Sequence, residues 1–242
     1  QINSETHESQ PSLSADGRTL FFVSDRQGGF GGLDIYVSYK NEGGTWGNPT
    51  NLGYLINTTE NEGSPYFHPN GTSLFFSSKG HIGMGGYDLF LSEWENDNWT
   101  EPRNLGYPIN DQNNQLSLFV NAKGDKGYYS KEEFTGATPT SNQSRIWTFD
   151  VPPELKLGHR SNYVKGKVFD NISKKPISAS LKLVNIETDK TVGQVASNQL
   201  NGSYLVMLAE GAEYAFYAET PGYLFKSISF NYTEKKDFEP IE

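Results

Sequence analysis

The chain has 242 residues with 14% aromatic residues and no cysteine, and it carries a formal net charge of −9 at pH 7. An acidic chain without a run of Lys and Arg lacks the basic stripe that nucleic acids and anionic membrane surfaces require, and no stretch approaches the roughly 20 apolar residues of a membrane-spanning helix. The aromatic residues and 25 glycines favour short strands joined by tight turns, and the lack of cysteine favours a bacterial protein over a disulfide-stapled eukaryotic one.

An internal repeat organises the first part of the sequence. Residues 8–57 and 62–110 are two clear copies, and a third, degraded copy begins near Gln115 and ends at Val151. The pairs that recur at a nearly constant spacing are Pro11 and Pro65, Gly17 and Gly71, Asp34 and Asp88, Trp46 and Trp99, Pro49 and Pro102, and Leu52-Gly53 and Leu105-Gly106. A period that is kept at so many positions indicates a repeat architecture.

Each copy contains the pattern of short strands. A turn pair lies between two apolar runs in every copy and predicts a hairpin with positive φ at both residues; the three pairs are Asp16-Gly17, Asn70-Gly71 and Lys123-Gly124. The aromatic run 20–23 predicts a strand buried between packed sheets, and residues 34–37 predict the next strand after a Gly-rich loop. A polar hairpin then leads to Trp46 and a fourth strand. Four strands in about 50 residues predict one blade of a β-propeller.

The repeat resembles the WD40-like PD40 blade, which is also found in the TolB propeller. The residues that carry the resemblance are Ser12-Leu13-Ser14-Ala15-Asp16-Gly17-Arg18, 21–26 and Gly32-Leu33-Asp34-Ile35-Tyr36, with Ser64-Pro65-Tyr66-Phe67-His68-Pro69-Asn70-Gly71 in the second copy. We therefore expect about three PD40-type blades in residues 1–151. Because propellers close with roughly four to eight blades, this number predicts that the sequence starts part-way through a propeller.

The repeat stops at Pro152-Pro153, so residues 152–160 are expected to be a linker and residues 161–242 a second domain. Alternating apolar residues predict strands at 163–169, 179–184, 202–208, 213–219 and 226–231, which suggests a small β-sandwich. This half resembles the carboxypeptidase regulatory-like domain, a non-catalytic, transthyretin-like sandwich. The matching residues are Val164-x-Gly166-x-Val168-x-Asp170, Lys175-Pro176-Ile177, Asn201-Gly202-Ser203-Tyr204 and Ala218-x-x-Pro221-Gly222-Tyr223.

The order of the two halves resembles the multidomain OmpA-family envelope proteins of Bacteroidetes, which include the PorE-like component of type IX secretion. This resemblance implies a non-catalytic scaffold in the periplasm that is associated with the outer membrane. The implied partners are envelope proteins, such as secretion or gliding components, and peptidoglycan, which would be bound through a C-terminal domain not present in this sequence. No cofactor is expected.

Two pairs of repeated side chains are candidate site residues. Asp34 and Asp88 follow Gly-rich loops and are expected to accept hydrogen bonds from turn amides rather than to bind calcium or act as catalysts. Trp46 and Trp99 are likewise expected to be structural repeat positions. Arg26 and Lys79 precede the Gly-rich loops at positions that we expect to be equivalent, and loops on a rigid scaffold commonly carry binding residues. They are the predicted partner contacts.

Catalytic and metal sites are not expected. His7, His68, His81 and His159 show no metal-ligand spacing, and neither a thiol nucleophile nor a G-x-S-x-G motif occurs. Two alternatives to the scaffold stay open. One is a glycan-active or peptidase-associated propeller enzyme with its catalytic residues in missing blades. The other is a carbohydrate-binding module that stacks sugars on Trp94, Trp99 or Tyr107.

Overall fold

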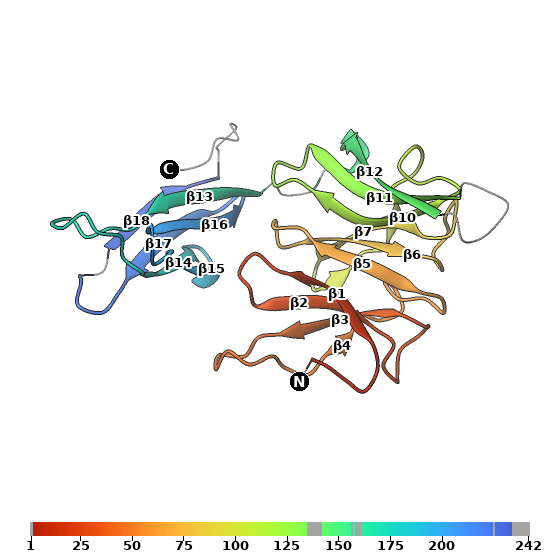
Figure 1. Ribbon diagram of the computed structural model, residues 1–242, viewed down its shortest axis with the longest axis horizontal. Helices are drawn as coiled ribbons and strands as arrows, with labels where there is room; N and C mark the ends of the chain where they lie inside the picture. The colour runs from red at the N-terminus through yellow and green to blue at the C-terminus, as the bar shows by residue number, and fades with distance from the viewer. Residues whose placement is uncertain (1, 135–141, 156, 158–160, 225, 234–242) are drawn as a thin grey trace. The chain divides into compact units, whose positions relative to one another are not determined.

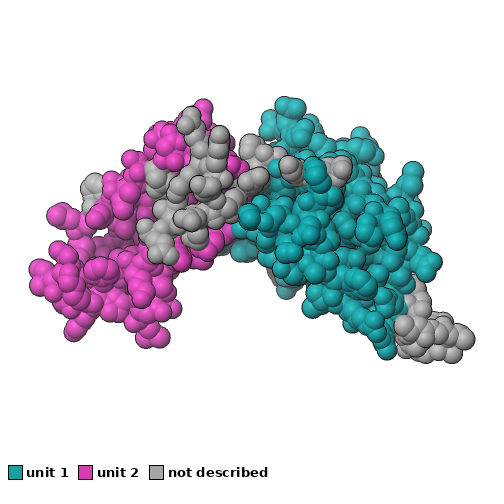
Figure 2. Space-filling model, turned by 90° about the horizontal axis from the view of Figure 1, so that it is seen from above, with its two compact units in different colours: residues 1–14, 18–157 teal, residues 15–17, 158–242 magenta. Residues whose placement is uncertain are grey.

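The computed structural model describes residues 2–134, 142–155, 157, 161–224 and 226–233. In these residues the chain forms eighteen β-strands and one 3-10 turn at Pro153–Leu155, which confirms the predicted all-β class. The chain divides into two compact units (Figure 2). Residues 1–14 and 18–157 form the propeller unit, and residues 15–17 and 158–242 form the sandwich unit.

The propeller unit contains three antiparallel sheets, one for each copy of the repeat, stacked in chain order (Figure 1). The first blade has the order β1 (Glu8–Leu13), β2 (Thr19–Ser24), β3 (Asp34–Tyr39) and β4 (Thr50–Asn51). The second contains β5 (Glu62–Phe67), β6 (Ser73–Ser78) and β7 (Asp88–Glu95), with β8 (Asn98–Trp99) and β9 (Arg103–Asn104) both paired to β7. The third has β10 (Asn114–Val120), β11 (Lys126–Phe134) and β12 (Asn142–Asp150).

The third blade differs from the predicted pattern of four strands, because its described residues form three. After β12 the chain reaches Pro152 and Pro153 and enters the 3-10 turn. Proline has no backbone N–H and cannot extend a ladder, so the sequence itself explains why no further strand follows directly.

The alternation of side chains along the strands packs the blades together. Phe75 and Phe76 are neighbours on β6, and their side chains point to opposite faces of the sheet. Phe76 packs with Phe21 and Val23 of the first blade, whereas Phe75 packs with Leu118 of the third. Both phenylalanines are almost completely buried, and each contributes about 1.5–3 kcal/mol of hydrophobic stabilisation. The consecutive aromatic residues of the repeat therefore serve two interfaces at once.

The repeated hairpin turns have a different geometry from the one that the sequence predicted. Only the glycine of each pair has a positive φ, at 67° for Gly17, 80° for Gly71 and 72° for Gly124. Each loop is longer than two residues, since the amide of His68, for example, donates to the carbonyl oxygen of Ser73 at 2.9 Å. A two-residue left-handed turn occurs instead at Asn96-Asp97, between β7 and β8.

A β-bulge recurs in the first strand of every blade. Gln10, Ser64 and Ser117 have φ angles of 53°, 50° and 52°, which are unusual for residues other than glycine. The pairing register shifts at each of these positions. The bulged residues contact one another across the blades, because the Ser64 amide donates to the side-chain oxygen of Gln10 and the Ser64 and Ser117 hydroxyls are 3.5 Å apart. The sequence pattern contained no sign of these bulges.

The sandwich unit has two antiparallel sheets. One pairs β13 (Ser161–Lys167) with β16 (Ser203–Ala209), and the other has the order β15 (Lys190–Ala196), β14 (Ser180–Asn185), β17 (Glu213–Glu219) and β18 (Lys226–Asn231). Leu181, Leu183 and Val206 are buried between them. The sequence analysis missed β15. Its Gly193 passes close to Val206, where an added Cβ would lie 2.8 Å from a methyl carbon, so a residue of low strand propensity is required there.

Candidate functional site

Among the residues that the structure describes, four connecting loops emerge at the same end of the propeller sheets. Glu8, Ser24 and Asp34 are register partners at that end of the first blade, and Glu62, Ser78 and Asp88 are the corresponding residues of the second. The described loops at this end are 25–33, 52–61, 79–87 and 105–113. We call this surface the loop face. It is the candidate site, because binding residues concentrate on loops that a rigid scaffold positions.

Asp34 holds the Gly-rich loop of the first blade. Its carboxylate accepts hydrogen bonds from the amides of Phe30 at 2.5 Å and Gly31 at 3.1 Å, and from the side-chain nitrogen of Asn51 at 2.8 Å. Only 1% of the residue is exposed. This carboxylate satisfies backbone donors, which is the structural role expected from the sequence.

Asp88 makes the matching contacts in the second blade. Its Oδ2 accepts hydrogen bonds from the amides of Met84 at 2.8 Å and Gly85 at 3.0 Å. Met84 and Gly85 occupy the same places before Asp88 as Phe30 and Gly31 do before Asp34, so the repeated loops share one backbone arrangement.

The backbones of neighbouring loops approach so closely that glycine is required at Gly31 and Gly85. A Cβ on Gly31 would overlap the carbonyl oxygen of Glu60 in the next loop, and a Cβ on Gly85 would overlap those of Asp111 and Asn113. Neighbouring loops of the loop face are therefore in direct contact. Glycine is the residue that allows backbones to approach so closely.

Repeated asparagines complete the network beneath the loop face. Asn57 donates to the carbonyl oxygen of Ile35 at 2.9 Å and accepts from its amide at 2.8 Å, and Asn110 makes both bonds to Leu89 at 2.9 Å. The side-chain amide of each asparagine thus donates to and accepts from one strand residue, as the backbone of a neighbouring strand would. The sequence analysis missed them, although both end the repeated segments Leu52–Asn57 and Leu105–Asn110.

The expected equivalence of Arg26 and Lys79 is wrong. The amide of Arg26 donates to the hydroxyl of Ser24 at 3.1 Å, and the corresponding bond of the second blade runs from Gly80 to the hydroxyl of Ser78 at 3.0 Å. The structural counterpart of Arg26 is therefore Gly80. Lys79 is out of register by a single position, because the copies are 54 residues apart on both sides of Arg26, from Gly17 and Gly71 to Asp34 and Asp88.

The side chain of Arg26 is engaged within the propeller unit. Its guanidinium forms an ion pair with Glu8 at 3.0 Å and lies 5.1 and 4.9 Å from the ring centroids of Phe22 and Tyr36. These contacts make Arg26 a packing residue of the first blade. Lys79 is exposed on the loop face and stays a predicted partner contact.

The tryptophans do not form a flat sugar platform. Trp99 packs against the core between the first two blades, with its ring 6.1 Å from that of Phe21. Trp94 meets Trp99 edge-on at 5.1 Å with an interplanar angle of 71°. Trp46 is half-buried, and its backbone forms an isolated antiparallel β-bridge with Lys40. A stacking platform for a sugar requires an exposed, flat ring face, so this pair does not favour the carbohydrate-binding alternative.

The histidines also have structural contacts. His68 and His81 each bond a backbone carbonyl oxygen, at 3.2 and 3.0 Å, and burial lowers the pKa of His68. His7 is exposed, and His159 lies outside the described residues. In the part of the chain that the structure describes, no group of three or more His, Asp or Glu side chains is arranged to hold a metal ion.

Glu62 is the most deeply buried carboxylate near the loop face. Burial raises its pKa, and the hydrogen bonds from the Thr58 amide and the hydroxyls of Thr58 and Ser78, each at 2.7 Å, oppose that shift. Glycoside hydrolysis requires two carboxylates that face a common substrate, whereas Glu62 is fully buried.

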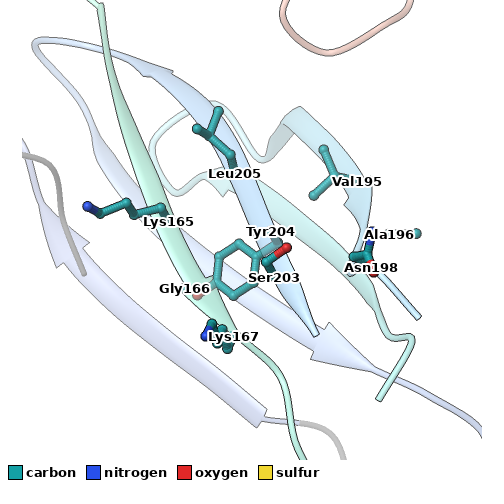
Figure 3. A pocket seen from close by; sticks show the side chains of 9 residues that line it. All are labelled: Lys165, Gly166, Lys167, Val195, Ala196, Asn198, Ser203, Tyr204 and Leu205. Atoms are coloured by element: carbon teal, nitrogen blue, oxygen red, sulfur yellow. The ribbon is translucent and has the colours of Figure 1, made fainter. Parts of the chain in front are cut away.

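The sandwich unit carries an open hollow of about 890 Å³. Lys165, Lys167 and Leu205 line it from β13 and β16, and Val195 and Asn198 face them from the end of β15 and just beyond it (Figure 3). These side chains are at least partly exposed. Small-molecule sites instead enclose most of the ligand and orient it with a few fixed polar groups. The loop face therefore remains the better candidate.

Comparisons with known proteins yield partial structural likenesses. No protein-family model matches the sequence, and no curated protein matches it. The chain is similar to TolB from Acinetobacter baumannii, with 12% identity, a TM-score of 0.42, and coverage of 96% of this chain and 42% of that one. It is also similar to a GH43_12 from a capybara gut metagenome, with 14% identity, a TM-score of 0.36, and coverage of 88% and 40%.

A third similar structure is a puromycin hydrolase mutant complexed with PGG, with 9% identity, a TM-score of 0.29, and coverage of 89% of this chain and 34% of that one. The chain thus spans about two-fifths or less of the length of these three proteins. The assignment of blades rests on the sheet order and the repeat given above.

Proposed function

We propose that this chain is a non-catalytic scaffold of a bacterial envelope complex and that it binds another protein through its loop face. The observation that carries the proposal is the way in which buried Asp34, Asp88, Asn57 and Asn110 fix the loops from beneath. A loop that is ordered before binding loses less conformational entropy when a partner docks. Each of these four side chains accepts a hydrogen bond from a backbone amide, a structural role that favours binding over catalysis.

The cellular setting that we propose is the periplasm, in association with the outer membrane. The support is the resemblance of the repeat to PD40 blades and of the second half to a carboxypeptidase regulatory-like domain, in the order found in OmpA-family proteins of Bacteroidetes. In this proposal the scaffold links a secretion machine of the type IX class to peptidoglycan through a domain outside this sequence. None of the described residues form a helix long and apolar enough to cross a membrane.

Site-specific photo-crosslinking in cells tests the proposal. A photoreactive amino acid replaces Lys79 on the loop face or, in a matched control, exposed Glu42 in the loop after β3 at the opposite end of the sheets. We expect a crosslink to an envelope protein from position 79 and none from position 42. Equal crosslinking from both positions, or turnover of glycans or peptides by the purified chain, would refute the non-catalytic scaffold.

A further inference from the structure

Apolar side chains project from all four loops of the loop face. Their exposed fractions are 48% for Phe30, 76% for Tyr54, 52% for Met84 and 79% for Tyr107. Single exposed apolar residues are common on protein surfaces and need no explanation. These four differ because they are two repeated pairs: Met84 occupies the repeat position of Phe30, and Tyr107 occupies that of Tyr54. We call them the apolar row.

The residues around the apolar row differ between the two copies of the repeat, whereas the row positions themselves stay apolar. Gln27 and Gly28 of loop 25–33 correspond to His81 and Ile82 of loop 79–87, and Asp25 corresponds to Lys79. Because the side chains of the row are exposed, core packing does not explain why each position stays apolar in both copies. Contact with a partner explains it.

The backbone beneath each member of the row is fixed. The amides of Phe30 and Met84 are the donors that Asp34 and Asp88 accept. Tyr54 follows Gly53, whose φ is 85°, and the carbonyl oxygen of that glycine accepts a hydrogen bond from Asn57 at 2.9 Å.

Tyr107 is held in the same way. It follows Gly106, whose φ is 68°, and the carbonyl oxygen of Gly106 accepts a hydrogen bond from Asn110 at 2.9 Å. Large side chains on a rigid backbone are the residues that commonly dominate protein interfaces, because little ordering is needed when they dock.

The four loops adjoin one another in sequence order. The amide of Gly32 donates to the carbonyl oxygen of Glu60 at 2.9 Å, which joins the first loop to the second. His81 bonds the carbonyl oxygen of Ile56 at 3.0 Å, which joins the second to the third. Gly85 lies against Asn113, which joins the third to the fourth. The apolar row therefore crosses one continuous surface.

The net charge of residues 1–151 favours a basic partner. Residues 1–151 contain nine Lys and Arg against eighteen Asp and Glu, so all of the net charge of −9 belongs to this part, and residues 152–242 contain eleven of each. Within the four loops, the exposed charged residues are Asp25, Glu60 and Lys79. Opposite charge on a partner accelerates and orients its docking.

We propose that the apolar row is the contact surface for a protein partner that presents aliphatic side chains flanked by Lys and Arg. The inference rests on the proposed protein-binding function and names the residues and the partner chemistry of that same site. Phe30, Tyr54, Met84 and Tyr107 supply the apolar contacts, and the carboxylates of Asp25 and Glu60 face the basic side chains.

Binding of labelled synthetic peptides to the whole chain tests the chemistry. The probes are three peptides of equal length that alternate leucine with lysine, leucine with glutamate, and serine with lysine, measured by fluorescence anisotropy at physiological ionic strength. We expect the leucine–lysine peptide to bind about tenfold or more tightly than either of the others, because both apolar contact and charge are needed. Equal affinity for the serine–lysine peptide would overturn the role of the apolar row.

The matched variants are Tyr54→Ser with Tyr107→Ser, and Ile172→Ser with Leu200→Ser as a control on exposed residues of the sandwich unit. The first pair is expected to weaken binding of the leucine–lysine peptide about tenfold or more, and the control is expected to leave it unchanged. An unaltered urea midpoint verifies that each variant is folded. Equal losses in both variants would refute the inference.

The same variants separate this inference from the proposed function. Suppose that a crosslink from position 79 captures an envelope protein. If that protein, once purified, binds the Tyr54→Ser, Tyr107→Ser chain as tightly as the original chain, the apolar row is not its contact surface. The inference then fails, and the proposed scaffold function stands. If loop-face positions give no crosslink, the scaffold fails. A self-associated chain that the double substitution makes monomeric would assign the row to a second copy and would also overturn the inference.

Discussion

Replacement of the buried carboxylate at position 34 is the sharpest test of the loop architecture. Asp34→Ala removes the acceptor of two backbone amides and of the Asn51 side-chain amide. The loss of the acceptor costs about 1 kcal/mol of stability for each of the two loop amides, because water can replace it there. It costs up to about 2 kcal/mol for the Asn51 nitrogen, which is less able to reach solvent. We therefore expect the free energy of unfolding of the propeller unit to fall by about 4 kcal/mol, a large part of the total for a domain.

Tryptophan fluorescence during urea unfolding measures this change in the propeller unit alone. All four tryptophans, at positions 46, 94, 99 and 147, belong to that unit, and the sandwich unit has none. Glu42→Ala, at an exposed position of the same blade, is the control and is expected to change the free energy of unfolding by less than about 0.5 kcal/mol. A loss below about 1 kcal/mol for Asp34→Ala would show that the carboxylate does not hold the loop.

Three further predictions concern packing and pH. Gly85→Ala places a Cβ against backbone oxygens and is expected to destabilise the propeller unit by at least about 2 kcal/mol, whereas Gly43→Ala, where a Cβ meets nothing within 4 Å, should have almost no effect on the urea midpoint. Phe76→Ala empties a fully buried position between the first two blades and should cost about 3–5 kcal/mol in the same assay. The pKa of Glu62 is raised above its ordinary 4.5, so the folded state holds its proton more tightly and stability falls as the pH rises through the folded pKa. Glu62→Gln should therefore be more stable than the original chain at neutral pH and lose that advantage below 4.5, and an advantage independent of pH in urea titrations would contradict the assignment.

The strands and their arrangement in blades could be predicted because they depend on local alternation and on the repeat. The predicted strand at 34–37 lies within β3, and the aromatic run 20–23 lies within β2 with both faces buried. The turn geometry was predicted less well. A polar residue followed by glycine signals a turn, but the length of the loop is set by which backbone groups meet across the hairpin. β15 was missed although it contains Val192 and Val195, because Gly193 between them has low strand propensity and is held in the strand by pairing with β14.

The sequence by itself determined that the chain is built from repeated all-β blades followed by a sandwich, since side-chain period, turn residues and repeat spacing are local properties. Only the tertiary structure decided which polar residues hold the loop face. Asn57 bonds Ile35 across 22 residues, and Arg26 turns inward to Glu8 across 18. Such pairings depend on the approach of segments that are distant in the sequence, so residue type and spacing alone do not specify them. The same approach places the exposed members of the two repeated loop pairs on a single surface.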